Sequence, residues 1–212
     1  MIVVAFISQK GGVGKSTLAR ALAREAASSG LQVKVGDLDT DQATIIDWHK
    51  VRTQRGIEPV LSVELFRSIA DAVKAAGRYD LLVIDGPAKA STSTTEIAKK
   101  SQLIVQPTGP ALDDLKPAIR VFHGLVKAGI PANRLVFALN HIGTDNEADA
   151  ARTYLKEAGY EALPGHLQER PAYRIAQNEG YAITETRFVS LKGRADTLVQ
   201  ALIDRVGEAA NG

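Results

Sequence analysis

The stretch that decides the fold is SQKGGVGKST, residues 8–17. It follows an apolar run at residues 2–7 and opens a segment rich in Ala and Leu, which predicts a strand, a glycine loop and a helix in succession. Because glycines carry no Cβ, the backbone N–H groups around them can close on phosphate oxygens. Lys15 can place its ammonium on the outer phosphates, and Ser16 can offer a hydroxyl to Mg²⁺. The stretch therefore predicts a phosphate-binding loop made of Gly11, Gly12, Val13, Gly14, Lys15, Ser16 and Thr17.

Composition limits the class of protein. The 212 residues, of which 45% are apolar and 24% charged, predict one globular domain over residues 1–212. The absence of Cys excludes disulfides and cysteine-ligated iron–sulfur clusters. Met1 leads directly into the first expected strand, and no apolar run approaches the length of a membrane span. We therefore expect a cytoplasmic protein without a signal peptide. The net charge of +2 permits an anionic partner without indicating one.

Short, β-branched apolar runs recur along the chain and are mostly separated by helical patterns. Continuous runs without polar alternation are typical of strands that are buried on both faces. Alternation of strand and helix predicts an α/β fold with right-handed crossovers, a mostly parallel, doubly wound sheet and helices on both of its faces. The expected strands are residues 2–7, 33–35, 60–63, 81–84, 103–105 and 135–139, and the clearest helical patterns cover 16–29, 64–76, 111–128 and about 193–208.

Polar side chains follow several of these strands at the point where each strand ends. Asp37 and Asp39 come after the second strand, Asp85 after the fourth, and Asn140 after a later one. In open α/β sheets, ligands bind beyond the carboxyl ends of the strands, which is also where the glycine loop begins. We therefore expect these four residues and the loop to form one site.

The glycine loop departs from the usual phosphate-binding pattern in one respect. The place five residues before Gly14, usually a glycine, is Gln9, and a second lysine, Lys10, follows it. This Lys-Gly-Gly-x-Gly-Lys-Ser loop resembles the deviant Walker A loop of the ParA/MinD family of ATPases, and the likeness covers nearly the whole chain. The resemblance implies a single-domain P-loop NTPase that binds ATP and Mg²⁺ and forms a homodimer in the ATP state. Lys10 would then contact the phosphates bound by the partner subunit, and Lys15 those of its own site.

The resemblance also implies roles for the first acidic segment. Residues 36–42 resemble switch I, in which Asp37 would orient the Mg²⁺ shell and Asp39 would position the attacking water. Whether Asp41 or Gln42 takes the place of the switch I glutamine is left open. An alternative for these acids is that they only cap the next helix.

The second acidic segment, residues 81–87, resembles a Walker B strand followed by switch II. Asp85 would hold Mg²⁺ through water, and Gly86 and Pro87 would sense the γ-phosphate. Alone, a strand that ends in Asp is a weak signal, so this interpretation depends on the glycine loop.

Two further residues are implied to bind the base of the nucleotide. Asn140 resembles the asparagine that hydrogen-bonds the adenine edge, because an amide can donate to N7 and accept from the amino group. An asparagine in an ordinary turn is the alternative. Pro164 follows an expected strand where the family's adenine pocket closes.

The nearest group is the small ParA ATPases that segregate bacterial plasmids or chromosomes. The resemblance implies slow ATP hydrolysis, stimulated by a ParB-like or other cargo-bound adaptor protein, and non-specific DNA binding on the nucleoid. Arg187, Lys192 and Arg194 are candidate DNA contacts, with a solvated surface charge as the alternative for each.

Three alternatives stay open. The first is a membrane-associated positioning ATPase of the MinD type. Against it, the last helical pattern mixes acidic and basic residues, which favours docking on the core over a stable membrane anchor. The second is a metabolic P-loop ligase or kinase, whose turnover would need a small acceptor. The third changes only the cargo, which would be a protein assembly in place of a plasmid or chromosome.

Overall fold

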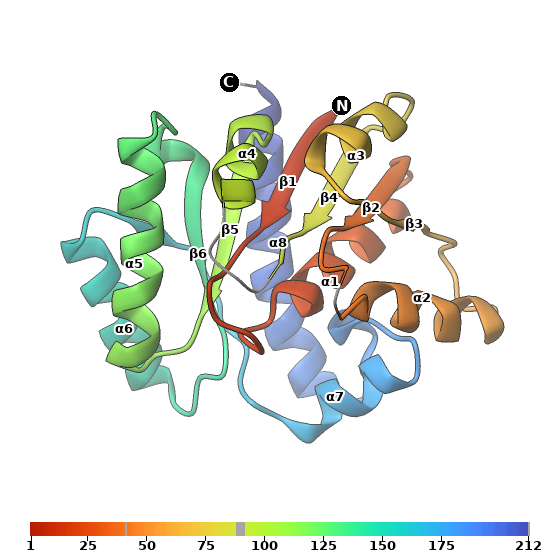
Figure 1. Ribbon diagram of the computed structural model, residues 1–212. Coiled ribbons are helices and arrows are strands. Elements are labelled where there is room, and N and C mark those ends of the chain that lie inside the picture. Colours follow the sequence, from red (N-terminus) through yellow and green to blue (C-terminus); the bar gives the residue numbers. More distant parts are fainter. Residues whose placement is uncertain (41, 88–91, 212) are drawn as a thin grey trace.

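The computed structural model describes residues 1–40, 42–87 and 92–211. Within these ranges, seven strands form one sheet: β1 (Ile2–Phe6), β2 (Val33–Asp37), β3 (Ser62–Leu65), β4 (Leu81–Asp85), β5 (Leu103–Thr108), β6 (Leu135–Leu139) and β7 (Glu161–Ala162). They lie in the order β3-β2-β4-β1-β5-β6-β7, and every neighbouring pair is parallel (Figure 1). The predicted parallel, doubly wound sheet is confirmed.

Helices cover both faces of the sheet, as the alternation of strand and helix predicts. The α-helices are α1 (Lys15–Ser28), α2 (Thr44–Gln54), α3 (Ile69–Ala75), α4 (Thr92–Lys100), α5 (Leu112–Lys127), α6 (Asp145–Glu157), α7 (Pro171–Asn178) and α8 (Val189–Asn211). Two 3₁₀ turns, η1 (Ala132–Arg134) and η2 (Ile183–Glu185), join later elements.

Two apolar layers enclose the sheet because successive side chains of a strand point to opposite faces. Val4 and Phe6 of β1 pack in one layer with buried residues of α1, α2, α7 and α8. Val3 and Ala5 pack in the other layer with buried residues of α3, α4, α5 and α6. β4 and β6 are buried along their full lengths, which explains their continuous apolar sequences.

The order of the strands changes direction at β1, which lies between β4 and β5. β2, β3 and β4 lie on one side of β1, and β5, β6 and β7 lie on the other. The carboxyl end of a strand at such a reversal is where open α/β sheets bind their ligands. The glycine loop follows β1 directly and therefore lies at this point.

The expected third strand and the helix after it are displaced in the structure. The predicted start of the strand at residue 60 is wrong. Val60 is 75% exposed, and pairing with β2 begins only at Ser62. The helix predicted from residue 64 begins only at Ile69, since residues 64 and 65 pair with β2. Ser68 fixes the new start, because its side chain accepts a hydrogen bond from the backbone N–H of Asp71.

The last helix, α8, is longer than the pattern at 193–208 predicts and packs against the core. Ala195, Leu198, Val199 and Leu202 are buried in the layer that includes α1 and β1. The apolar face of α8 is therefore occupied within the subunit, as expected. In the described part of the chain, no helix combines the length and hydropathy that crossing a membrane requires.

Candidate nucleotide-binding site

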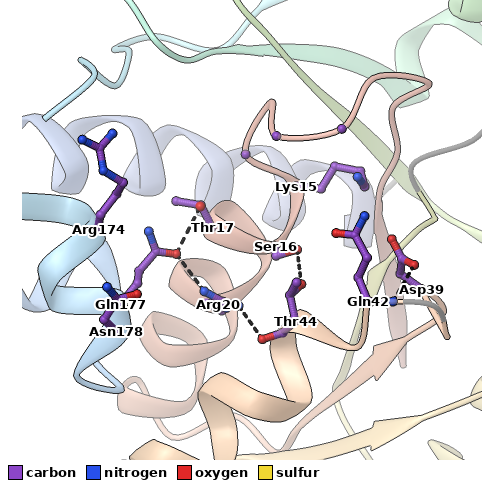
Figure 2. A pocket seen from close by; sticks show the side chains of 13 residues that line it. Lys15, Ser16, Thr17, Arg20, Asp39, Gln42, Thr44, Arg174, Gln177 and Asn178 are labelled. Atoms are coloured by element: carbon purple, nitrogen blue, oxygen red, sulfur yellow. Dashed lines mark hydrogen bonds between the residues drawn. The ribbon is translucent and has the colours of Figure 1, made fainter. Parts of the chain in front are cut away.

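A cavity of about 330 Å³ lies between the glycine loop, the start of α2 and α7 (Figure 2). The loop and the first turns of α1 form one wall, the segment after β2 a second, and α7 a third. Its lining residues are Gly11, Gly12, Gly14, Lys15, Ser16, Thr17, Arg20, Asp39, Gln42, Thr44, Arg174, Gln177 and Asn178. The structure thus brings the predicted phosphate loop and the predicted switch I together around one space.

Gly14 shows why the loop needs glycine at the point where α1 begins. Its φ is +105°, a left-handed conformation that side chains rarely adopt, and a Cβ there would lie 2.1 Å from Nδ2 of Asn140. Asn140 comes this close because its Nδ2 donates a hydrogen bond to the carbonyl oxygen of Val13 at 2.8 Å. The end of β6 therefore supports the loop directly.

Ser16 and Asp85 meet at the start of α1. The hydroxyl of Ser16 donates to Oδ2 of Asp85 at 2.5 Å, while Oδ1 of Asp85 is buried and has no hydrogen-bond partner among the described residues. Burial, and less strongly repulsion from Asp37, raises the pKa of Asp85 to about 7, whereas the hydrogen bond from Ser16 and the charges of Lys15 and Arg20 oppose this rise. A carboxylate in this position is costly unless a cation joins it.

The residues present fit a magnesium ion. Mg²⁺ prefers hard oxygen ligands and keeps several waters, and Ser16 and Asp85 offer a hydroxyl and a carboxyl oxygen that lacks a partner. Asp37 is fully buried one strand away, and its carboxylate accepts the backbone N–H groups of Asp39 at 2.9 Å and Ile45 at 3.3 Å. These bonds hold Asp37 in place and suit it to an outer role, in which it orients a metal-bound water.

The segment after β2 takes the form of a turn that leads into α2. The backbone N–H of Ala43 donates to the carbonyl oxygen of Asp39 at 2.8 Å, and that of Gln42 donates to its carboxylate at 3.3 Å. Asp39 therefore caps this turn and lines the cavity at the same time. Gln42 also lines the cavity, whereas Asp41 lies outside the described residues.

The segment predicted to be switch II is described only in part. The N–H of Gly86 donates to the carbonyl oxygen of Phe6 at 2.9 Å, and a Cβ at Gly86 would lie 2.8 Å from that same oxygen. Glycine is therefore required where the chain leaves β4 beside β1. Pro87 is the last described residue before the gap at 88–91.

Lys10 does not line the nucleotide cavity. Its ammonium forms an ion pair with Asp114 in the first turn of α5, which raises the pKa of Lys10. The two residues lie beside a separate cavity of about 250 Å³, which also includes the buried Gln106. The side chain of Lys10 is 59% exposed and that of Asp114 is 17% exposed, so the pair is open to solvent on the lysine side.

The two residues predicted to bind the base are placed differently. A cavity of about 200 Å³ shares part of its wall with the first and includes Asn140. Both ends of the Asn140 amide are already engaged, since its Oδ1 accepts the N–H of His141 at 2.9 Å. Pro164 is exposed and lines neither of these cavities. The structure therefore brings Asn140 to the site and leaves Pro164 outside it.

The candidate DNA contacts lie near the start of α8. Arg187 and Lys192 are exposed, and the guanidinium carbon of Arg187 lies 5.2 Å from the ring centroid of Phe188. Arg194 forms an ion pair with Asp145 at 3.1 Å, so part of its charge is already balanced.

Several residues that line the cavity are not among the site residues expected from the sequence, and they include Arg20, Thr44 and Gln177. The hydroxyl of Thr44 lies 3.0 Å from that of Ser16, and Oε1 of Gln177 accepts from Thr17 at 3.1 Å. Arg20 lies between them (Figure 2). An arginine within a helical pattern that is otherwise rich in Ala and Leu is the sequence signal that could have indicated it.

The parallel sheet, the glycine loop at its reversal point and the Ser16–Asp85 pair together define a P-loop nucleotide-binding protein. The family model of the CobQ/CobB/MinD/ParA nucleotide binding domain matches residues 4–183, so the chain belongs to this family. The resemblance to ParA/MinD ATPases is therefore confirmed.

Known proteins share sequence or fold with this chain. The maintenance of carboxysome distribution protein A of Gloeobacter kilaueensis is 28% identical over 186 residues, which cover 87% of this chain and 85% of that protein. A chain of the MinC:MinD cell division protein complex of Aquifex aeolicus matches with a TM-score of 0.77 and 17% identity, and the match covers 96% of each chain. MinD of Pyrococcus horikoshii OT3, complexed with Mg-ADP, matches with a TM-score of 0.76 and 18% identity. The match covers 100% of this chain and 99% of the MinD chain. These structures share the fold.

Proposed function

We propose that this protein is an ATP-dependent dimer switch that positions a large cargo in the bacterial cell. The observation that carries the proposal is the placement of the two loop lysines. Lys15 lines the nucleotide cavity, whereas Lys10 lies outside it, is itself exposed and pairs with the half-buried carboxylate of Asp114. One lysine is therefore available to the subunit's own nucleotide and the other to a second subunit.

Within one subunit, the phosphates of ATP would lie on the backbone N–H groups of the loop, with Lys15 at the outer phosphates. Ser16 and Asp85 would hold Mg²⁺, and Asp37 would orient a water bound to it. When bound, this ion neutralises charge that develops on the transferred phosphoryl group. Asp39 accepts hydrogen bonds as a carboxylate, so it can hold the attacking water in line from the neighbouring wall of the cavity.

Dimerisation would exchange one partner of Lys10 for another. In the single subunit, Asp114 balances the Lys10 charge. At a dimer interface, the triphosphate of the partner subunit offers a stronger anion, and an unpaired lysine there would be costly. The dimer is therefore favoured only when nucleotide is bound, which makes association depend on ATP.

The proposed function also includes the cargo that the protein positions and the DNA that it binds while doing so. Non-specific DNA binding needs several phosphate contacts and no base recognition, and Arg187 and Lys192 are exposed candidates for it. A cargo-bound adaptor protein, ParB-like or of another kind, would stimulate hydrolysis and release the dimer from the nucleoid. The relative named for carboxysome distribution supports a protein assembly as the cargo, beside a plasmid or a chromosome.

The MinD-type alternative is a membrane-associated switch, and the solved MinD chains share this fold. Because Ala195, Leu198, Val199 and Leu202 are buried in the subunit, the apolar face that they form on α8 is not available to a bilayer, and at the start of this helix Val189 is exposed. Sedimentation with anionic lipid vesicles, with ATP and with ADP, distinguishes the two. A metabolic ligase or kinase would instead need a small acceptor for turnover.

The deciding experiment measures ATP hydrolysis and oligomeric state together. We expect slow hydrolysis that requires Mg²⁺, a dimer with ATP and a monomer with ADP. DNA of random sequence should bind the ATP form and be released as salt rises. A chain that stays monomeric with ATP under all conditions, or that turns over only with a small acceptor, would contradict the proposal.

A further inference from the structure

Arg20 is a partly buried cation that the phosphate loop does not require, and its Nε is buried without a hydrogen-bond partner among the described residues. It lies one helical turn after Ser16 on α1 and lines the nucleotide cavity (Figure 2). Burial lowers the pKa of Arg20 to about 10, which leaves it protonated at neutral pH, and attraction to Asp85 and Asp37 opposes the lowering. Buried charges of this kind are uncommon unless they are paired or have a specific task.

The contacts of Arg20 define that task. Its Nη2 donates to the carbonyl oxygen of Thr44 at 2.6 Å, and the next N–H in the chain, that of Ile45, donates to Oδ2 of Asp37 at 3.3 Å. A single peptide group is thus held at its oxygen by a cation and at its nitrogen by an anion. This is the first peptide group of α2, directly after the turn that contains Asp39.

The same guanidinium also reaches α7. Its Nη1 donates to Oε1 of Gln177 at 3.0 Å, an oxygen that also accepts from Thr17. The guanidinium carbon of Arg20 also lies 5.4 Å from the ring centroid of Trp48. Nε1 of Trp48 in turn donates a hydrogen bond to the carbonyl oxygen of Tyr181 at 3.1 Å. Arg20 therefore joins α1, α2 and α7, the helices that form three walls of the cavity.

We propose that Arg20 is a positioning residue, which fixes the start of α2 against the phosphate loop so that the hydroxyl of Thr44 and the Asp39 turn are held in place for hydrolysis. The inference rests on the proposed ATPase function and adds to it a residue that acts through α2. Because the loop N–H groups and Lys15 do not depend on Arg20, its loss should affect hydrolysis more than nucleotide binding.

The test compares the wild type with Arg20→Met, Arg20→Lys and a control, Arg24→Met. Arg24 lies one turn further along α1, pairs with Glu25 and Glu185, and does not line the cavity. Each protein is assayed for kcat and KM with Mg-ATP and for the affinity of Mg-ADP by calorimetry. Trp48 is the only tryptophan of the chain, so its emission reports on α2 when Mg²⁺ and a slowly hydrolysed ATP analogue are added.

For Arg20→Met we expect kcat to fall by roughly 10- to 100-fold, since small displacements of positioned groups carry losses of this size. We expect KM and the Mg-ADP affinity to stay within about threefold of the wild type. Arg20→Lys should be intermediate, because an ammonium cannot reproduce the planar pair of hydrogen bonds. The emission change of Trp48 on adding the analogue should be lost in Arg20→Met and kept in Arg24→Met.

A wild-type kcat in Arg20→Met, or a raised KM with kcat unchanged, would overturn the inference. The inference would also be overturned if adding the analogue changes the emission of Trp48 equally in the wild type and in Arg20→Met, or changes it in neither. If Arg20→Met does not fold, Arg20→Lys provides the same comparison. If the wild type does not hydrolyse ATP, the proposed function fails, and the Trp48 comparison still decides whether Arg20 connects α2 to the loop.

Discussion

The ammonium of Lys10 forms an ion pair with the carboxylate of Asp114, which lies in the first turn of α5, 104 residues further along the chain. The pair lies next to the glycine loop but outside the nucleotide cavity. For Lys10 to contact phosphates across a dimer, as we propose, this pair must open. Asp114 therefore competes with the partner's nucleotide for Lys10, and this competition can be measured.

We expect Asp114→Asn to dimerise at a lower ATP concentration than the wild type, by roughly two- to fivefold, the range that fits an exposed ion pair. Lys10→Ala should stay monomeric at the same concentrations. Light scattering over an ATP titration measures both effects. Asp113→Asn is the matched control, because Asp113 lies in the same turn of α5 and no ion pair joins it to Lys10 among the described residues. Unchanged dimerisation of Lys10→Ala would exclude its role at the interface.

We expect Asp39→Ala to bind Mg-ATP and to hydrolyse it at least about tenfold more slowly, because the carboxylate that positions the water is lost. Single-turnover hydrolysis separates this effect from product release. Asp47→Ala is the control, since Asp47 lies on the exposed side of α2 and pairs with Lys50. A normal rate in Asp39→Ala would leave Asp39 with only its turn-capping role.

We expect Asp85→Asn to stabilise the nucleotide-free protein at pH 8, by on the order of 1–3 kcal/mol. The pKa of Asp85 is raised from 3.8 to about 7, so the folded state retains a proton that the unfolded state loses, and stability falls as pH rises through this window. The gain should shrink toward pH 4. Thermal melts at both pH values measure it.

The same melts, repeated with Mg-ATP, test the role of Asp85 in metal binding. The wild type should gain stability on adding Mg-ATP, whereas Asp85→Asn should gain much less, because one ligand of the ion is missing. Equal stabilisation of both proteins would show that Asp85 does not take part in holding the ion.

We expect Gly14→Ala to lower the free energy of unfolding of the nucleotide-free protein by roughly 1–3 kcal/mol. The added Cβ would meet Nδ2 of Asn140 at 2.1 Å, and φ at this position is +105°. Gly11→Ala is the matched change in the same loop, because a Cβ there meets no atom within 4 Å and φ is not left-handed. Urea denaturation should therefore separate the two variants, and equal curves would show that the loop adapts freely.

Much of the fold could be predicted from residue order. The continuous apolar runs of β1, β4, β5 and β6 could be read as buried parallel strands, and the glycine loop identified the point at which the sheet binds its ligand. Prediction failed where a short apolar run was ambiguous. The local pattern predicts a strand at 60–63 and a helix at 64–76, but pairing with β2 and the cap at Ser68 set the actual boundaries.

The chemistry of the phosphate loop follows from residue order alone, because Lys15 and Ser16 follow one another at fixed positions on a strand–loop–helix unit. It also placed Asp37 and Asp85 at one edge, since parallel strands end together. The partners of these residues, in contrast, are set by how the folded chain packs. The pairing of Lys10 with Asp114, the support of Gly14 by Asn140 and the placement of Arg20 beside Thr44 join segments far apart in the chain. No local pattern encodes such contacts, because they depend on how helices from different crossovers pack over the same edge of the sheet.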